Sequence, residues 1–366
     1  MSAERTKLKI TTVTPVAIGS GNELSPYADY VVDRNRVFYI DRKKLQRKIA
    51  HNDQLLECYI TGIASKMDNN RSEFDLKRFL LNAVKVNIED VSLLHCPMIS
   101  RKPESKLTIK SMLKTPFHEP YFPGSSLKGA LKTVLMYAWL NSKKASEWVE
   151  DFLKKCGEPD RNESDKGINR LLNDLESKFE YSESHPQVLQ QVADSSPIAK
   201  ESVTVVDGTR NMPIRIECIQ SRVQSTFELC LCNKTWNELA NSINAYAINV
   251  LYREEDLIKD DDNLIDYYNR LVEIQEKIQD LIDDAVDGVA YLRIGYGKGF
   301  YFNSIAEVVY EYAKKDNAKF RLYENYMKRL YPPKPGKTFK LDDFPKTRLY
   351  IDKTQEPLGW VKIEKI

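Results

Sequence analysis

The 366-residue chain lacks any run of about 20 apolar residues that could form a transmembrane helix. Its first residues, MSAERTKLKI, are polar and basic and have no apolar signal-peptide core. It also lacks a strong overall charge, because 55 Lys and Arg against 53 Asp and Glu leave a net charge of +2. With 42% hydrophobic and 30% charged residues, the composition predicts a soluble, cytoplasmic protein with one elaborated domain or two domains.

Cysteine and histidine are too few and too scattered to indicate a metal centre or a disulfide scaffold. The six cysteines lie at positions 58, 96, 156, 218, 230 and 232, and only the two in TFELCLC are close. A zinc site needs Cys-x-x-Cys or Cys/His pairs, and a disulfide scaffold needs denser cysteines. The four histidines, at 51, 95, 118 and 185, form no ligand pattern. We therefore expect no metal and no cofactor, and we expect the cysteines to be small buried hydrophobes.

Charge is distributed unevenly along the chain. Residues 1–144 carry 24 Lys and Arg against 14 Asp and Glu, a net of +10, whereas residues 254–287 carry 3 against 13, a net of −10. A solvated helix face explains the acidic stretch, but basic residues in the first half recur beside glycine turns. We expect the acidic helix at 263–287 and the basic half to suit docking with unlike neighbours.

Strand and helix patterns are mixed, without the regular alternation of a doubly wound fold. They predict an α+β fold in three parts: a strand-rich unit at 1–141, a helical and partly mobile insertion at 142–192, and a second strand-rich unit at 193–366. Strands are expected at 7–18, 106–113, 202–206, 214–219, 227–232, 347–351 and 360–363, with a hairpin turning at Arg34-Asn35. Helices are expected at 42–50 behind an Asp41 N-cap, and at 54–66, 73–86, 127–140, 236–252, 263–287 and 305–314.

The chain has only 14 glycines, yet three glycine turns stand out: AIGSGN (17–22), PGSSLKGALK (123–132) and RIGYGKGF (293–300). None of them matches a nucleotide-binding motif. The second turn has Ala-Leu where a P-loop requires Lys followed by Ser or Thr. The third has phenylalanine where a dinucleotide fingerprint requires its last glycine. The turns therefore argue against a nucleotide-hydrolysing enzyme.

The second turn has the composition of a phosphate site. Ser125 or Ser126 is expected to cap a helix whose apolar spacing begins at Leu127. Lys128 and Lys132 then lie near the positive end of that helix, which is unfavourable unless an anion binds there. Free amides, a hydroxyl and two lysines together predict a phosphate site. A capped core helix with solvated lysines is the alternative interpretation.

The third turn also has two interpretations. It could be an ordinary glycine bend after a strand. It could instead carry backbone flat against a nucleic-acid strand, because glycine permits close approach. In that case Arg293 and Lys298 would supply charge, and Tyr296 or Phe300 would supply a stacking face.

Taken together and in this order, the turns resemble the RAMP (repeat-associated mysterious protein) superfamily of CRISPR effector complexes. Four further segments narrow the resemblance to the fifth subunit of type III-A Csm complexes: TPVAIGSG, Asp194-Ser195-Ser196-Pro197-Ile198, MPIRIECI (212–219) and PLGWVKI (357–363). The resemblance spans almost the whole chain and is weakest at 42–105 and 142–191. It implies a ferredoxin-like, RRM-like fold, with two such units and a glycine-rich loop near the C-terminal end.

The resemblance implies a non-catalytic subunit that caps the Csm backbone filament, holds the 3′ portion of the CRISPR RNA (crRNA) and supports crRNA maturation in antiviral defence. The implied partners are crRNA, the repeated backbone subunit, the small subunit and, indirectly, target RNA; no membrane is involved. Arg215 and Glu217 of PIRIECI are expected in or beside the RNA face. From the turns and the resemblance together, the residues expected to bind RNA are Gly19, Ser20, Gly21, Gly124, Ser125, Ser126, Lys128, Lys132, Arg215, Arg293, Gly295, Gly297, Lys298 and Gly299.

An endoribonuclease that processes precursor CRISPR RNA is the alternative function, and a protein-interaction scaffold is a third. Some RAMP relatives that cleave RNA carry a histidine in the first turn, where this chain has AIGS, and only His118 lies near another turn. Acid/base cleavage by histidine is therefore poorly supported. Asp29 and Asp33 match, by position only, the loop aspartate of target-cutting backbone subunits, and Asp33 equally suits a hairpin turn. We expect no nuclease activity.

Overall fold

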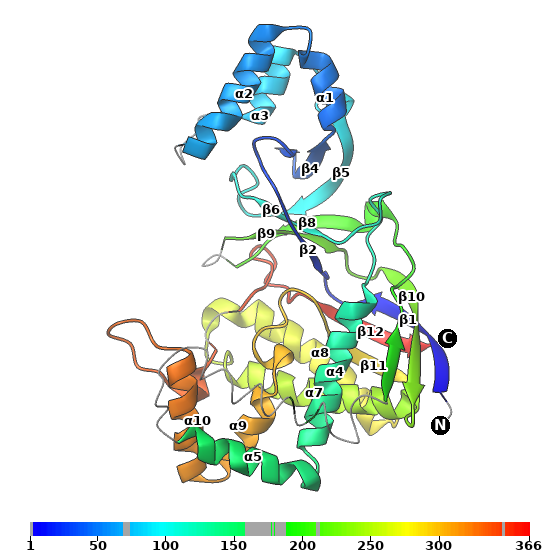
Figure 1. Ribbon diagram of the computed structural model, residues 1–366, viewed down its shortest axis with the longest axis vertical. Coiled ribbons are helices and arrows are strands. Elements are labelled where there is room, and N and C mark those ends of the chain that lie inside the picture. Colours follow the sequence, from blue (N-terminus) through cyan, green and yellow to red (C-terminus); the bar gives the residue numbers. More distant parts are fainter. Residues whose placement is uncertain are drawn as a thin grey trace.

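The computed structural model describes residues 3–68, 74–157, 177, 179, 188–209, 213–345 and 348–366. It contains two β-sheets, a layer of helices beside one of them and a small helical lobe at the far end of the other (Figure 1). Within the described residues, no helix combines the length and the apolar character needed to cross a membrane.

The first sheet has five antiparallel strands drawn from distant parts of the chain. Its order is β11-β12-β1-β10-β7, so β1 pairs with β10 on one side and with β12 on the other. Leu8 and Ile10, two positions apart on β1, are fully buried, as expected where one face of a strand packs on helices. The strands are β1 (Ala3–Thr12), β7 (Leu189–Val192), β10 (Gln224–Cys232), β11 (Val289–Arg293) and β12 (Trp360–Lys365).

The second sheet has seven strands in the order β2-β6-β9-β8-β5-β4-β3. The β6–β9 and β5–β8 pairs are parallel and the others are antiparallel. The hairpin predicted at Arg34-Asn35 is confirmed, and both residues have positive φ. The strands are β2 (Gly19–Leu24), β3 (Tyr30–Asp33), β4 (Arg36–Ile40), β5 (Ser92–Ile99), β6 (Ile109–Met112), β8 (Val203–Asp207) and β9 (Arg215–Ile219).

The chain between β4 and β5 forms the helical lobe at the top of Figure 1. The predicted N-cap is confirmed, because the Asp41 side chain accepts hydrogen bonds from the amides of Lys43 and Lys44. The lobe has a hydrophobic cluster of its own, built from its helices and from β3 and β4. Its helices are α1 (Arg42–Ile49), α2 (Asp53–Asp68), α3 (Leu76–Arg78), the π-helical η1 (Phe79–Val84) and the 3-10 turn η2 (Glu89–Val91).

The other helices cover the five-stranded sheet and one another. Helices α7 and α8 pack on β11, α4 packs on β7 and α7, and α10 packs on α5 and α9. These helices are α4 (Gly124–Leu140), α5 (Lys143–Cys156), α7 (Trp236–Asp256), α8 (Ile265–Asp283), α9 (Ala306–Lys314) and α10 (Asn317–Leu330). Short 3-10 turns are η3 (Lys200–Ser202), η4 (Asp262–Leu264), η5 (Tyr301–Asn303) and η6 (Leu341–Asp343).

The α+β class expected from the sequence is confirmed. Both sheets, however, combine strands from either side of the 142–192 segment, as in the β1–β10 and β5–β8 pairs. The division at residues 141 and 192 stays a prediction. Within that segment the structure describes α5, residues 177 and 179, and β7.

Some predicted elements differ from the structure. The strand expected at 347–351 is wrong in its described part, 348–351, because Tyr350 and Ile351 make isolated bridges to Pro357 and Gly208 and join neither sheet; residue 347 lies outside the described residues. The helix expected at 73–86 becomes the short α3 and a π-helical turn that ends at Lys85, where φ is +59°; residue 73 lies outside the described residues. The patterns also missed α10, β2 and β5, and Pro97 within β5 masks its strand character.

Candidate nucleic-acid interface

The first and third glycine turns lie in direct contact. The amide of Tyr296 donates to the carbonyl oxygen of Ala17 at 2.8 Å. A Cβ placed on Gly19 would approach Cε2 of Tyr296 at 2.9 Å, and one on Gly295 would lie 2.1 Å from the Ala17 oxygen. Packing within the protein therefore requires glycine at 295, where a side chain would collide with backbone, whereas a side chain at 19 would have to displace the Tyr296 ring. We call residues 17–21 and 295–299 the glycine platform.

The remaining glycines shape the platform differently. Gly297 has φ +87° and packs on Leu358, where an added Cβ would meet another Cβ at 2.8 Å. Gly359 accepts a hydrogen bond from the amide of Ile294 at 2.8 Å. The PLGW segment thus supports the loop from within the protein. At Gly299, φ is +69° but a Cβ would meet nothing within 4 Å, so this position faces open space.

Lys298 carries the clearest sign of an anion site. Its side chain is half-buried and has no ion-pair or hydrogen-bond partner among the described residues. Burial, and secondly the positive charge of Arg293, lower the pKa of Lys298 to about 8. A partly desolvated ammonium without a counter-ion is unfavourable, and a bound anion would relieve it.

Arg293 serves a different purpose. Its side chain is 1% exposed. Its guanidinium donates to Glu254 at 2.7 Å, to the hydroxyl of Tyr267 at 3.2 Å and to the carbonyl oxygen of Leu358 at 3.0 Å. The prediction that Arg293 contacts RNA is wrong, because the group is buried and its donors are used. Arg293 ties the end of β11 to α7, α8 and the PLGW segment.

Arg215 and Glu217 are also structural. Both are 0% exposed. Arg215 Nε donates to Asp207 at 2.7 Å, while Glu217 accepts from the amide of Met112 at 2.9 Å and from the ammonium of Lys114 at 2.8 Å. Neither side chain therefore lies in an exposed RNA face, and the expectation that they stand beside one stays a prediction. They join β9 to β8 and to the end of β6, the strand beside β2.

The N-terminus of α4 is capped from a distant segment. The helix begins at Gly124, and Ser125 and Ser126 lie inside its first turn, so the predicted serine cap is wrong. The carboxylate of Asp194 accepts a hydrogen bond from the Gly124 amide at 2.7 Å. The protein thus supplies the anion expected at this positive helix end. This contact also gives the segment 194–198 a structural purpose, because its first residue holds the start of α4.

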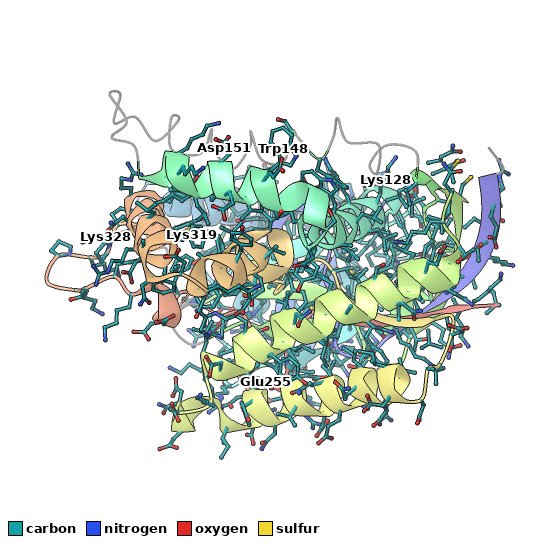
Figure 2. The ribbon with its side chains drawn as sticks, turned by 90° about the horizontal axis from the view of Figure 1, so that it is seen from below. Lys128, Trp148, Asp151, Glu255, Lys319 and Lys328 are labelled. Atoms are coloured by element: carbon teal, nitrogen blue, oxygen red, sulfur yellow. The ribbon has the colours of Figure 1, made fainter. Side chains whose placement is uncertain are left out.

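Contact with RNA at α4 would therefore depend on side chains. Ser125 and Lys128 are exposed, and Figure 2 shows Lys128 at the outer surface. Among the described residues, the Lys128 ammonium donates only to a carbonyl oxygen, that of Gln190, at 3.3 Å. Lys132 is half-buried and already interacts within the protein. Of the two lysines, Lys128 is the better placed to meet a ligand.

The candidate surface is extended. The glycine-rich loop leaves β11 at one edge of the five-stranded sheet, while α4 begins against β7 at the other. Four strand spacings separate these edges, or about 19 Å across the sheet. The structure therefore joins the first and third turns but not the second. Such an arrangement fits a long, thin ligand better than a small molecule.

Of the residues considered for catalysis, the two aspartates are held in ion pairs and the histidine is exposed in a turn. Asp29 pairs with Arg42 at 2.6 Å, and Asp33 pairs with Lys77 at 2.7 Å. His118 is exposed in a tight turn with φ +66°. In the part of the chain that the structure describes, no three His, Cys, Asp or Glu residues lie close enough to hold a metal ion.

Comparison with known proteins relates the chain to CRISPR systems. It is 25% identical over 404 aligned residues to "CRISPR system Cms protein Csm5" of Methanocaldococcus jannaschii, covering 98% of this chain and 88% of that protein. It is 27% identical over 138 residues to the protein of the same name from Streptococcus thermophilus, covering 36% of this chain and 37% of that one.

Solved structures show the same fold. A chain of a cryo-EM Csm–crRNA–target RNA ternary complex of a type III-A system superposes with a TM-score of 0.65 at 21% identity, covering 98% of this chain and 100% of that one. The crystal structure of T. onnurineus Csm5 gives a TM-score of 0.63 at 18% identity, covering 96% and 99%. A sequence model of the RAMP superfamily matches residues 9–302. The chain belongs to the RAMP superfamily.

Proposed function

We propose that this chain is a non-catalytic crRNA-binding subunit of a type III-A Csm complex. It caps the backbone filament at the 3′ portion of the crRNA, contacts the repeated backbone subunit and the small subunit, and supports crRNA maturation. The observation that carries the proposal is the glycine platform together with Lys298, whose ammonium has no partner in the described part of the chain. The names of the similar proteins, and the RNA complex in which one structural neighbour lies, support the choice of RNA as the anion.

Binding is led by the RNA backbone. A phosphate beside Lys298 would pair with an ammonium group that is already partly desolvated. The open side of Gly299 lets the RNA strand approach the loop. Lys128 and Ser125 hold a second point on the strand, across the five-stranded sheet. Because phosphates carry no sequence information, recognition is largely independent of base identity. Gly19, Ser20 and Gly21 shape the platform; the hydroxyl of Ser20 is already bonded to the Ser111 carbonyl.

A non-catalytic role agrees with the surroundings of the alternative catalytic residues. Asp29 and Asp33 are held in ion pairs with Arg42 and Lys77, and the exposed His118 has no basic or acidic partner among the described residues. General acid–base cleavage needs positioned groups of matched pKa.

The test is salt-dependent binding of the full chain to labelled single-stranded RNA with magnesium present, and a gel to check that the RNA stays intact. Lys128→Ala combined with Lys298→Ala should weaken RNA binding by about tenfold, because each lost lysine–phosphate ion pair contributes up to about 1 kcal/mol of binding free energy. The slope of log K against log salt should fall by about 1.4, because each lost phosphate contact removes about 0.7.

The matched control is Arg47→Ala combined with Lys48→Ala. Both residues are exposed on α1 of the helical lobe and have no ion-pair partner among the described residues. It removes the same charge far from the platform and should leave binding unchanged. Equal losses in both double variants would refute the site, and RNA cleavage that disappears in His118→Ala or Asp33→Ala would refute the non-catalytic role.

A further inference from the structure

A second basic surface lies on α10 and the loop that follows it. Residues 314–340 contain nine Lys and Arg against two Asp and Glu, a net of +7. In Figure 1 this loop, residues 331–340, is the orange segment without helix or strand that projects beyond α10. We call it the basic loop. A count of charge in the last quarter of the sequence would have revealed it.

Both acidic residues of this segment are used inside the protein. Asp316 caps α10, accepting from the amides of Ala318 and Lys319 at 2.8 and 3.4 Å. Glu324 accepts from the amide of Leu341 at 3.1 Å. Among the described residues, neither acid forms an ion pair with a lysine of the basic loop.

Two basic side chains of α10 also have partners within the protein. Lys319 pairs with Glu150 of α5 at 2.5 Å, on the side of α10 that faces α5 in Figure 2, and Arg329 donates to the carbonyl oxygen of Cys156. Four further lysines are exposed and have no ion-pair partner among the described residues. They are Lys328, labelled in Figure 2 at the end of α10 from which the loop departs, and Lys334, Lys337 and Lys340 of the basic loop.

The helix dipole explains only part of this excess of basic residues. Basic residues in the last turn of a helix are stabilised by the helix dipole, which accounts for Lys328 and Arg329. Lys334, Lys337 and Lys340 lie beyond the helix, and the dipole effect fades outside the last turn. The helix dipole therefore does not account for these three lysines.

The basic loop has a defined shape. The amide of Lys337 donates to the carbonyl oxygen of Lys334 at 3.0 Å, and Gly336 has φ +78°. With proline in the second position and glycine in the third, residues 334–337 match a type II turn, which brings its first and last Cα atoms within about 7 Å. Prolines limit the freedom of the loop, so the turn presents two lysines together at its tip.

The base of the loop is fixed beside the glycine platform. The ring of Tyr331 packs on Phe300, the last residue of RIGYGKGF, at a centroid distance of 5.6 Å. Phe344, just after the loop, packs on both rings at 5.1 and 4.8 Å. Tyr331 is still 41% exposed. A ligand that passes Lys298 therefore meets an exposed aromatic ring and then the basic loop.

We propose that the RNA strand continues from the glycine platform over the basic loop, where Lys334, Lys337 and Lys340 contact phosphates and Tyr331 offers a stacking face. This inference rests on the proposed function, since it extends the same bound strand. Unpaired lysines next to an exposed aromatic ring are the combination that single-stranded nucleic acid uses. An acidic protein surface is the alternative occupant, and the experiment separates the two.

The experiment compares the full-length parent with Lys334→Ala/Lys337→Ala/Lys340→Ala, using labelled oligoadenylates of about 4 to about 16 nucleotides. The parent should gain affinity with length until the basic loop is covered. The triple variant should stop gaining at a shorter length, and its salt slope for the longest RNA should be smaller by about 2. Affinity for the shortest RNA bound at the platform should not change.

The matched control is Lys43→Ala/Arg47→Ala/Lys48→Ala, which removes three exposed charges from α1. All six substituted side chains are exposed, and circular dichroism checks that the variants fold. If the parent binds RNA and the loop variant binds every length equally well, the inference is refuted while the proposed function stands. If RNA binding is unchanged but an acidic protein no longer binds, the loop is a protein contact and the inference is again refuted. If the parent binds no RNA, the proposed function itself fails.

Discussion

Raising the pH from 7 to 8.5 should weaken RNA binding through one side chain, Lys298. In the free protein its pKa is lowered to about 8, first by burial and then by the nearby charge of Arg293. A bound phosphate favours the charged form and returns the pKa toward its ordinary value. Binding is therefore linked to proton uptake, and affinity falls as the pH rises through the pKa of the free protein.

The size of the effect follows from the two pKa values. The pKa of Lys298 is about 8 in the free protein, and we take it as roughly 10.4 in the complex. In the free protein the charged fraction of Lys298 then drops from about 0.9 at pH 7 to about 0.24 at pH 8.5. The affinity should then fall about fourfold, which is roughly 0.8 kcal/mol.

Fluorescence anisotropy with a 2′-O-methyl oligoadenylate at constant ionic strength measures this change, because neither the bases nor the backbone react in that range. Lys298→Arg should bind equally well at both pH values, since a guanidinium keeps its charge. Lys128→Arg is the matched control and should keep the parent's pH dependence. A parent whose affinity is flat from pH 7 to 8.5, or a Lys298→Arg variant that falls as steeply as the parent, would refute the reasoning.

Three further predictions concern the supports of the interface. Asp194→Ala should lower the free energy of unfolding by about 1 kcal/mol in a urea titration, because α4 loses its cap; an unchanged urea midpoint would contradict the capping role. Gly295→Ala should destabilise the protein more than Gly299→Ala, since a left-handed backbone costs both about 1–2 kcal/mol but only the first meets a carbonyl oxygen at 2.1 Å; equal thermal midpoints would show that the clash is absorbed. Arg293→Met should cost about 3 kcal/mol of stability by leaving the largely buried carboxylate of Glu254 without its cation, and Arg293→Met/Glu254→Met should recover much of it; a stable single variant that binds RNA poorly would instead make Arg293 a direct contact.

Features that depend on neighbouring residues could be predicted from the sequence. The N-cap at Asp41 bonds to amides two and three positions away, and the hairpin at Arg34-Asn35 needs only two residues that tolerate positive φ. The start of α4 was predicted wrongly because its cap, Asp194, lies 70 positions from the amide it accepts from. The serines had the right chemistry, but a carboxylate from another segment took their place.

The same limit applies to the candidate site. RIGYGKGF holds two cations, Arg293 and Lys298, and their spacing does not tell which of them is buried. Arg293 is neutralised by Glu254 and donates a hydrogen bond to Tyr267, which lie 39 and 26 positions away in two other helices. Lys298 gains importance because no such partner reaches it among the described residues. The motif could be recognised from the sequence, whereas the division of roles within it depends on tertiary contacts.

The central position of β1 has a consequence for how the protein is made. Its two neighbours in the sheet, β10 and β12, are synthesised much later, and the Trp360 amide bonds to a threonine hydroxyl 346 positions earlier. Both edges of β1 are therefore open until β10 is made, and one edge stays open until β12 is made. Open strand edges promote association between chains. Sheets closed by such distant segments also form slowly. We expect the yield of soluble protein to rise when synthesis is slowed or when chaperones shield the nascent chain.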